Sequence, residues 1–346
     1  MDIDSNISGL MMVDTSPVGA GGSSFLVAEI GGNHGGNPVL AAEMVRAAAA
    51  AGAEAVKFQA YRTADFLSPL SPYYDELAAE ELPFDQLGKL VKQAHGLGLA
   101  AGLTVFDAAG IAFAQGCGAD FLKISSGDLT HPYLPRRAAE TGLPLFLSTG
   151  AAEEAEVSAA LAALGDTPGG LVIMQCAALY PAPAEAANLA VMRRWQSEGL
   201  KAGYSDHTLG LNAAKLAVAM GAAAVEKHFT TDRNLPGGDN SISATPEEFN
   251  ELVRWRNTCG VMLGQPVKRP HPLEVPMRPV IRRALVAGRP LCAGDILAAE
   301  DVKLQRPPSS TEELLAPDRL AEVVGRCLTQ DVPQGAALRL SDLERA

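Results

Sequence analysis

Short apolar runs alternate with longer amphipathic stretches along most of the chain. Runs of this length, bounded by turn residues, are typical of buried strands, and the stretches between them repeat with the period of a helix. Eight runs recur in order, at 25–30, 55–59, 100–104, 120–124, 144–148, 171–175, 201–205 and 223–229. Strands alternating with helices indicate a parallel sheet, and eight such units between residues 25 and 264 favour a closed (β/α)8 TIM barrel over an open doubly wound sheet.

Two of the expected helices carry clear end signals. The stretch 38–52 has Pro38 near its first turn and Gly52 at its C-cap, an asymmetry typical of helices. The last barrel helix, 246–256, follows Thr245, a favoured N-cap residue. These residues predict where both helices begin and where the first one ends.

The sequence texture changes after residue 264. Residues 265–279 are rich in proline, basic and without helical period, which predicts an extended linker. Residues 280–346 carry short β-like runs and Gly-Asp turns, so we expect a small β-rich domain there. Residues 1–24 contain no Lys or Arg, unlike a signal peptide, and we expect a flexible leader. The barrel is therefore predicted over 25–264.

The composition is that of an ordinary soluble globular protein, with 47% hydrophobic and 20% charged residues. The net charge of −12 argues against nucleic acid or an anionic membrane as the main partner, although local cations could still hold an anionic substrate. No apolar run approaches the roughly 20 residues of a membrane span. The five cysteines are widely spaced and lack a C-x-x-C pair, so we expect reduced, mostly buried thiols and a cytoplasmic protein.

Polar residues end the expected strands, where a barrel of this kind carries its chemistry. Two of them, His207 and His228, come from neighbouring strands. Two neutral imidazoles at one mouth can bind a divalent metal with open positions, and Asp206 or Glu226 could orient a ring. The alternative is that each histidine is an ordinary hydrogen-bonded residue of the rim.

A second group combines two strand-borne lysines, Lys57 and Lys123, with hydroxyl side chains. The hydroxyl residues are Thr104, Ser126, Ser148 and Thr149. Buried lysines need anionic partners, and a phosphate would serve both while the turns supply hydroxyls and N–H groups. Alternatively, the lysines pair with Glu29, Asp128 or Glu226, or one of them forms a Schiff base.

Two further segments give weaker signals. The glycine-rich stretch 31–36 could cradle a phosphate or only turn the chain after the first strand, and no nucleotide-binding motif occurs. The acidic run 76–82 is interpreted as a solvated helix face.

Together these pieces resemble the sialic acid synthase family, which makes N-acetylneuraminate, legionaminate and pseudaminate. The matching strings between residues 28 and 239 are A-E-I-G-G-N-H-G-G, V-K-F-Q, F-L-K-I-S-S-G-D, L-S-T-G, Y-P-A-P, G-Y-S-D-H-T-L-G, E-K-H-F-T and P-G-G-D. The C-terminal R-R-A-L-V-A, A-G-D-I-L and Q-R-P resemble that family's antifreeze-like (SAF) domain, a β-clip fold. The resemblance covers nearly the whole chain after residue 24.

The resemblance implies a reaction between phosphoenolpyruvate and an N-acylated hexosamine, either N-acetylmannosamine or a di-N-acetylated 6-deoxyhexose. Carbon C3 of phosphoenolpyruvate would add to the sugar aldehyde, water would attack C2, and phosphate would leave by C–O cleavage. A divalent metal, usually Mn²⁺ with Mg²⁺ or Co²⁺ as alternatives, would bind the aldehyde oxygen between His207 and His228.

The resemblance also implies roles for individual residues. Those matching the phosphoenolpyruvate site are Lys57, Thr104, Lys123, Ser126 and Ser148. Those matching the sugar site are Glu29, Gln59, Tyr180 and Asp239. Glu29, Lys57 and Lys123 are the catalytic candidates together with Asp128, which matches a family acid with a proposed role in proton transfer. A domain-swapped homodimer is implied, with Arg306 of one chain closing the sugar site of the other.

The chain departs from the family pattern at a few places. The strand-6 motif reads Q-C-A-A-L-Y-P, so Ala177 and Ala178 lack the expected hydroxyl or amide groups. P-G-G-D-N stands where P-G-P-D-H is usual, and R-P-P-S-S replaces R-P-G-x-G. These departures leave three alternatives open: a related phosphoenolpyruvate-condensing barrel, a metal-dependent aldolase, and a sugar-binding protein that has lost turnover.

Overall fold

The chain folds into two compact units, and the boundary between them along the sequence falls after residue 266. The structure is a computed structural model, and it describes residues 24–307 and 314–344. The expected leader, apart from Ser24, lies outside the described residues, as do Pro308, Ser309 and Ser310 of the R-P-P-S-S turn.

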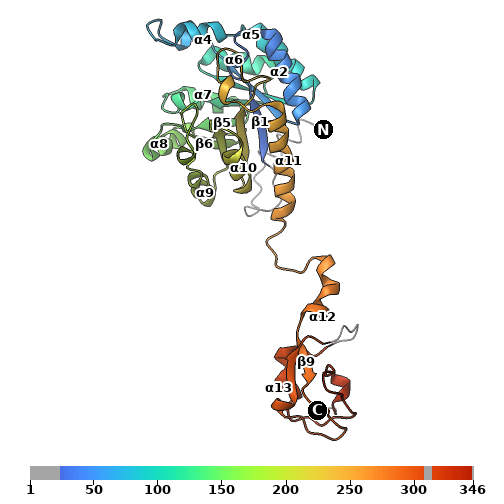
Figure 1. Ribbon diagram of the computed structural model, residues 1–346. Helices are drawn as coiled ribbons and strands as arrows, with labels where there is room; N and C mark the ends of the chain where they lie inside the picture. Colours follow the sequence, from blue (N-terminus) through green and yellow to red (C-terminus); the bar gives the residue numbers. More distant parts are fainter. Residues whose placement is uncertain (1–23, 308–313, 345–346) are drawn as a thin grey trace. The chain divides into compact units, whose positions relative to one another are not determined.

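The first unit is a closed barrel of eight parallel strands, as the alternating pattern predicted (Figure 1). The strands are β1 Phe25–Glu29, β2 Ala55–Ala60, β3 Ala100–Val105, β4 Phe121–Ile124, β5 Leu145–Ser148, β6 Leu171–Cys176, β7 Ala202–Asp206 and β8 Ala224–His228. Each strand pairs with the next, and β8 pairs with β1 in a register that sets Glu29 beside His228. The eight apolar runs therefore became the eight strands, within one residue at nearly every end.

Helices follow the strands and cover the outside of the barrel (Figure 1). They are α2 Pro38–Ala51, α3 Thr63–Phe66, α4 Tyr74–Glu80, α5 Phe84–Gly96, α6 Ala108–Cys117, α7 Leu134–Ala139, α8 Glu154–Leu164, α9 Ala190–Ser197, α10 Asn212–Ala219 and α11 Pro246–Leu263. Three short 3₁₀ turns, η1 Ser126–Asp128, η2 Ala184–Ala187 and η3 Asn240–Ile242, lie in the connections.

The capping signals operate as predicted. Gly52 ends α2 in the left-handed conformation, and the Thr245 side chain accepts from Glu248 N in a reciprocal capping box. The expected end of α11 at residue 256 was wrong, because no proline interrupts 257–263 and the helix continues to Gly264.

Alternate strand residues fill the barrel interior in a graded way. The lower layers are apolar, and Phe121 stacks on Phe146 with ring centroids 4.7 Å apart while meeting Phe25 edge-on. Glu29 lies two residues after Val27 in β1 and therefore on the same face as Phe25 and Val27. The interior thus changes from aromatic to ionisable along the strand direction, which places the polar side chains at the C-terminal mouth.

The tight packing of this interior makes a testable prediction at Gly102. A Cβ there would lie 2.1–2.7 Å from atoms of the Phe121 ring, so Gly102→Ala is expected to destabilise the barrel by about 1–3 kcal/mol. Gly116 of α6 has nothing within 4 Å of its Cβ position, and Gly116→Ala should stabilise by about 0.5–1 kcal/mol. Urea unfolding of both variants measures the two signs, and an unchanged midpoint for Gly102→Ala would contradict this packing.

The second unit has a two-stranded antiparallel sheet, β9 Ala284–Ala287 and β10 Val302–Gln305, and an apolar core of its own. The short helices in this unit are η4 Pro272–Met277, α12 Arg278–Ile281, η5 Ala299–Asp301, η6 Pro317–Arg319, α13 Leu320–Val323 and η7 Leu340–Asp342.

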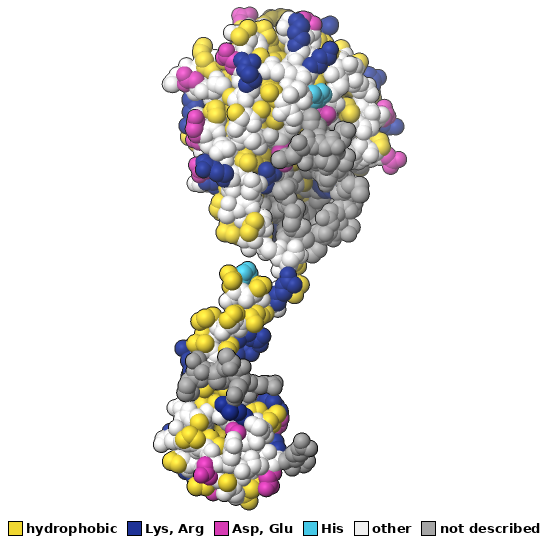
Figure 2. Space-filling model, turned by 90° about the vertical axis from the view of Figure 1, so that its right-hand side faces the viewer, with side chains coloured by type: hydrophobic (Ala, Val, Ile, Leu, Met, Phe, Trp, Pro, Cys, Tyr) yellow, Lys and Arg dark blue, Asp and Glu magenta, His cyan; other side chains and the backbone are white. Residues whose placement is uncertain are grey.

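The linker expected to be extended over 265–279 is partly helical. Prolines at the first turns of η4 and α12 and a capping box between His271 and Glu274 favour the helical turns. Hydrophobic side chains along it are exposed, among them Leu273 and Val275. Figure 2 shows yellow side chains on the surface of this segment.

All five cysteines are free, in agreement with the odd count and wide spacing. Cys176 and Cys259 are buried, whereas Cys292 is exposed and the other two are half-buried. The expectation of mostly buried thiols was therefore too broad. In the part of the chain that the structure describes, no helix combines the length and apolar character needed to cross a bilayer.

Candidate active site

A buried network of two lysines and two glutamates occupies the barrel mouth. Lys57 Nζ lies 2.6 Å from Glu29 Oε2 and donates to Thr104 Oγ1 at 2.6 Å. Lys123 Nζ donates to both carboxylate oxygens of Glu226, at 2.9 and 2.8 Å. Glu226 also lies 3.8 Å from Lys57 Nζ, so it bridges the two lysines. All four side chains are at least 95% buried, and their charges cancel.

The network favours different protonation states for its two acids. Burial alone would raise the pKa of Glu226, but Lys123 and Lys57 outweigh it and lower that pKa to about 2. Burial dominates at Glu29 and raises its pKa to about 7, against the attraction of Lys57. Glu226 is therefore the fixed anion of the site, whereas Glu29 can exchange a proton near neutral pH.

These contacts decide part of the question that the sequence left open for the lysines. Lys57 and Lys123 pair with Glu29 and Glu226, and Asp128 is not their partner. Asp128 instead accepts from Ser125 Oγ at 2.6 Å, and burial raises its pKa. Phosphate binding by the lysines stays a prediction.

The turns after β4 and β5 meet beside this network. Ser126 Oγ accepts from Gly150 N at 2.9 Å, and Thr149 Oγ1 donates to the Met174 carbonyl at 2.9 Å. A Cβ at Gly150 would lie 2.8 Å from Ser126 Oγ, so only glycine allows this approach. Ser148 ends β5 and is buried. The structure thus brings the predicted hydroxyl residues of two turns to one edge of the mouth.

The two histidines lie together, as predicted from their adjacent strands. Their ring centroids are 5.3 Å apart. Tyr180 stacks on His207 at 4.0 Å and meets His228 edge-on at 5.7 Å, so it joins the cluster as well. Asp239 Oδ2 lies 3.4 Å from His228 Nδ1, which brings a fourth predicted residue to the same point.

The imidazoles are suited to metal binding. His207 Nδ1 faces the Ala177 carbonyl at 2.7 Å, and because a carbonyl only accepts, Nδ1 carries the hydrogen and Nε2 keeps its lone pair. His228 Nδ1 is buried and has no hydrogen-bond partner. Burial lowers the pKa of His207 to about 4, and burial followed by the charge of His207 lowers that of His228. Both rings are therefore neutral, the form that binds a cation.

The donor set fits a metal bound mainly by two histidines. Among residues 24–307 and 314–344, no group of three or more His, Cys, Asp or Glu side chains forms a complete metal cage. A cation held by His207 and His228 would therefore keep open coordination positions for substrate or water.

The expectation that Asp206 or Glu226 orients a histidine was wrong. Asp206 accepts instead from Lys227 Nζ at 3.0 Å and from the Thr208 hydroxyl at 2.8 Å. Because Lys227 alternates with Glu226 and His228 along β8, it points away from the mouth and forms a buried ion pair on the outer face. Glu226 is engaged by Lys123 and by Ser205 Oγ, which donates at 3.1 Å.

The departures in the strand-6 motif have a structural account at residue 177. Ala177 orients His207 through its backbone carbonyl, which any residue would supply. Gln175, buried at the end of β6, donates to the Ala187 carbonyl at 3.1 Å and so holds the loop toward η2. The alanine therefore leaves the histidine orientation intact.

The glycine-rich turn 31–36 is tied to other loops of the mouth by hydrogen bonds that its composition does not indicate. Asn33 Nδ2 donates to the Phe229 carbonyl at 2.9 Å and to Ser243 Oγ at 2.8 Å, which ties this turn to the loop after β8. A Cβ at Gly31 would lie 3.0 Å from Glu29 Oε1 and 3.5 Å from Gln59 Nε2, so both predicted sugar-site side chains border the turn.

The acidic run 76–82 is not uniformly solvated, which corrects the sequence interpretation. Glu80 and Glu81 are half-buried: Glu80 accepts from Gly238 N at 2.6 Å, and Glu81 accepts from Thr63 N at 2.7 Å. Sequence reasoning missed Asn33 and Glu80, whereas it had offered Glu226 as one possible partner of the lysines.

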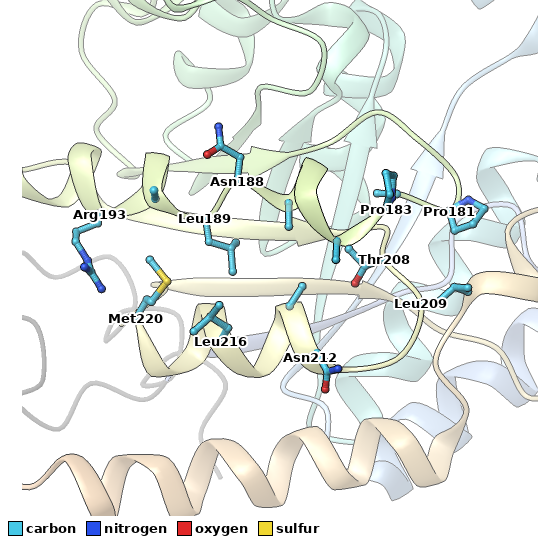
Figure 3. Close-up of a pocket in the computed structure, with 15 residues that line it drawn as sticks. Pro181, Pro183, Asn188, Leu189, Arg193, Thr208, Leu209, Asn212, Leu216 and Met220 are labelled. Carbon is cyan, nitrogen blue, oxygen red and sulfur yellow. The ribbon is translucent and has the colours of Figure 1, made fainter.

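An apolar hollow lies outside this polar cluster. Its volume is about 860 Å³, and it lies between η2, α9 and α10, lined by Pro181, Leu189, Leu209, Leu216 and Met220 among others (Figure 3). None of the ionisable mouth residues lines it, and among the described residues Arg193 is its one charged lining residue. The chemistry of the chain therefore belongs to the mouth and not to this hollow.

Arg306 lies in the second unit, directly after β10, and is exposed. It lines a small hollow with Arg283, Leu304 and Gln305. Its expected approach to the sugar site of another chain stays a prediction.

Comparison with known proteins identifies the family of the chain. The chain matches the NeuB family over residues 44–268 and the SAF domain over residues 282–344. It is 36% identical to the N,N'-diacetyllegionaminic acid synthase of Legionella pneumophila, over 95% of this chain and 97% of that relative. It is 29% identical to the N-acetylneuraminate-9-phosphate synthase of Mus musculus, over 82% and 83% of the two chains.

A solved structure shares the fold as well. The crystal structure of N-acetylneuraminic acid synthetase from Leptospira borgpetersenii, in complex with citrate, matches with a TM-score of 0.70. The identity is 32%, and the match covers 73% of this chain and 90% of that chain. The chain therefore belongs to the NeuB family of sialic acid synthase-type proteins and carries a SAF domain.

Proposed function

We propose that this protein is a phosphoenolpyruvate-dependent nonulosonic acid synthase that uses an N-acylated amino sugar as acceptor. The observation that carries the proposal is that the lysine pair and the histidine pair share one barrel mouth and are linked by β8, which bears both Glu226 and His228. Family membership supports sugar-acid synthesis, and the buried lysines supply cations of the kind that a phosphate and a carboxylate need.

The proposed reaction balances as follows. A bond forms between C3 of phosphoenolpyruvate and the aldehyde carbon, and the aldehyde oxygen gains a proton. The oxygen of water adds to C2, and a C2 carbonyl forms as the C2–O bond to phosphate breaks; of the two water protons, one ends on the former aldehyde oxygen and the other on the released phosphate. Lys57 and Lys123 would hold the phosphate and carboxylate, with Thr104, Ser126 and Ser148 as hydrogen-bonding hydroxyls. Glu29 and Asp128, whose pKa values burial raises, would exchange the protons.

Phosphoenolpyruvate would have to compete with Glu226 for the lysines. The formal charges of the two lysines and two glutamates cancel, so an entering trianion needs Lys57 and Lys123 to turn their ammonium groups toward it. Protonation of Glu29 would release the positive charge of Lys57 for this purpose. The raised pKa of Glu29 thus suits the arrival of an anion.

His207 and His228 would hold a divalent cation, Mn²⁺ in the first place and Mg²⁺ or Co²⁺ otherwise, which when bound polarises the acceptor aldehyde. Tyr180 and Asp239 border the same point, so they would orient the acceptor sugar together with Gln59. The SAF domain would supply Arg306 from a second chain in a domain-swapped homodimer. We expect the protein to act in the cytoplasm without a membrane or nucleic-acid partner.

The mouth favours an acceptor without a phosphate group. Asp239 is half-buried, and partial burial together with the nearby charge of Glu76 raises its pKa to about 6. Glu80 adds a third carboxylate beside Gly238. Arg62, a cation near this side of the barrel, lies over the Phe84 ring at 5.2 Å. A sugar phosphate would meet like charge here, whereas N-acyl N–H and hydroxyl groups would find acceptors.

Phosphate release from phosphoenolpyruvate with Mn²⁺ tests the proposal. Acceptors should include N-acetylmannosamine, a di-N-acetylated 6-deoxyhexose and N-acetylmannosamine 6-phosphate, with a chelator control. We expect acceptor-dependent release with a neutral sugar, at least about tenfold greater kcat/KM than with the phosphorylated one. Tight metal binding without release for any acceptor would contradict the synthase and favour a sugar-binding protein.

A further inference from the structure

One side chain, Glu80 at the end of α4, joins three segments on one side of the mouth. Its Oε1 accepts from Gly238 N at 2.6 Å. Its Oε2 takes the space that a Cβ on Gly32 would need, 2.2 Å from that position. Glu80 therefore contacts both the glycine-rich turn after β1 and the loop after β8, although it lies in neither.

The contact with Gly238 bears directly on Asp239, the next residue. Asp239 N donates to Asn33 Oδ1 at 2.8 Å, and Asp239 Oδ2 lies 3.4 Å from His228 Nδ1. A shift of the Gly238 backbone would move the Asp239 carboxylate relative to His228, because Gly238 directly precedes Asp239 in the chain. Glu80 thus holds the loop at the point from which Asp239 reaches the histidine.

The local sequence explains why a side chain is needed at this point. Gly237 and Gly238 have φ values of 75° and 54°, a conformation that favours glycine. Gly238 has an N–H that needs a partner and no side chain that would restrict its backbone. A charge-assisted hydrogen bond from this N–H to Glu80 supplies both the missing partner and the missing restraint.

A second set of contacts attaches α4 to the barrel independently of Glu80. Tyr61 OH donates to the Leu77 carbonyl at 3.0 Å, and Glu81 Oε2 accepts from the Thr63 hydroxyl at 2.8 Å. Loss of the Glu80 contact would therefore loosen the backbone at Gly238 while α4 remains attached and Asn33 still holds the rest of the loop.

We propose that Glu80 is a positioning residue for the amino-sugar acceptor, which it serves by fixing the Gly238–Asp239 backbone beside His228. The inference rests on the proposed function, because the acceptor is the ligand that Asp239 would contact. Glu80 touches no lysine or hydroxyl residue of the phosphoenolpyruvate side, so its effect should be confined to the acceptor.

Three full-length variants test the proposal: Glu80→Ala, Glu80→Gln and Asp75→Asn. Asp75 is an exposed acid of α4, so Asp75→Asn removes the same charge without touching the loop. We expect Glu80→Ala to raise KM for the acceptor about tenfold, with kcat and KM for phosphoenolpyruvate within about twofold of wild type. Glu80→Gln should recover most of this loss, because its amide carbonyl still accepts from Gly238 N. Asp75→Asn should match wild type.

Hydrogen exchange of the unliganded protein gives a readout that needs no turnover. A peptide containing 234–240 should exchange faster in Glu80→Ala than in wild type or Asp75→Asn. An unchanged acceptor KM in Glu80→Ala, or equal losses for both substrates together with a lower melting temperature, would overturn the positioning role. A wild-type protein inactive with every acceptor would overturn the proposed function and the acceptor role with it, while faster exchange would still establish the contact.

Discussion

Replacement of Lys123 by methionine should both destabilise the barrel and abolish turnover. Lys123 makes the two shortest contacts of Glu226, a carboxylate that is almost completely buried. Removing one partner of a buried ion pair leaves an uncompensated charge, which costs about 3–5 kcal/mol. Loss of a cation from the phosphate side should lower kcat by about 10²–10³-fold or more. Urea unfolding and phosphate release measure the two effects separately.

A double variant separates stability from catalysis. Lys123→Met with Glu226→Gln removes the ammonium and the charge that it neutralises, so the double variant should regain most of the lost stability. Its turnover should stay as low as that of Lys123→Met, because the phosphate ligand is still missing. Recovery of activity in the double variant would contradict a role for Lys123 in binding phosphoenolpyruvate.

Replacement of His228 by alanine should remove metal binding and turnover together. His228 supplies one of two neutral imidazoles, and the described residues offer no complete cluster of alternative ligands. Since loss of residues that only support a ligand costs 10–100-fold in metal affinity or activity, loss of a ligand should weaken Mn²⁺ binding by at least about 100-fold. Calorimetric titration with Mn²⁺ measures the affinity, and phosphate release measures the activity.

A histidine on the outside of the barrel provides the control. His95 of α5 is half-exposed and lies 2.8 Å from Asp120, which precedes the first residue of β4. It is therefore away from the C-terminal strand ends that form the mouth. His95→Ala should bind Mn²⁺ as tightly as wild type. Equal Mn²⁺ affinity in His228→Ala and wild type would show that the cation is held elsewhere.

The barrel was predictable because one physical signal repeats through it. Buried parallel strands need continuous apolar runs, and the eight runs coincide with the eight strands. The barrel also predicted that the two histidines would lie at one mouth with the two lysines, because the C-terminal ends of all its strands gather there. The end of α11 and the helical turns after Pro272 were missed, because the sequence there has helix-compatible residues but little periodicity.

The finer features of the site depend on contacts that no periodicity encodes. Glu226 was one of several acids that could face the lysines, and only its distances to Lys123 and Lys57 identify it as the shared counter-ion. His207 is oriented by a backbone carbonyl, a group that every residue carries. Glu80 belongs to an acidic run in which Glu76 is exposed and Glu81 contacts Thr63, so the composition of the run gave no sign of the Gly238 contact.

The fate of the bridging oxygen of phosphoenolpyruvate tests the central claim most directly. The protein should be incubated with Mn²⁺, a neutral N-acylated amino sugar and phosphoenolpyruvate that carries heavy oxygen between C2 and phosphorus. Mass spectrometry should find one sugar acid formed per phosphate released, with the heavy oxygen in the phosphate. Heavy oxygen in the sugar acid, or consumption of phosphoenolpyruvate without a new sugar acid, would contradict a synthase that works by C–O cleavage.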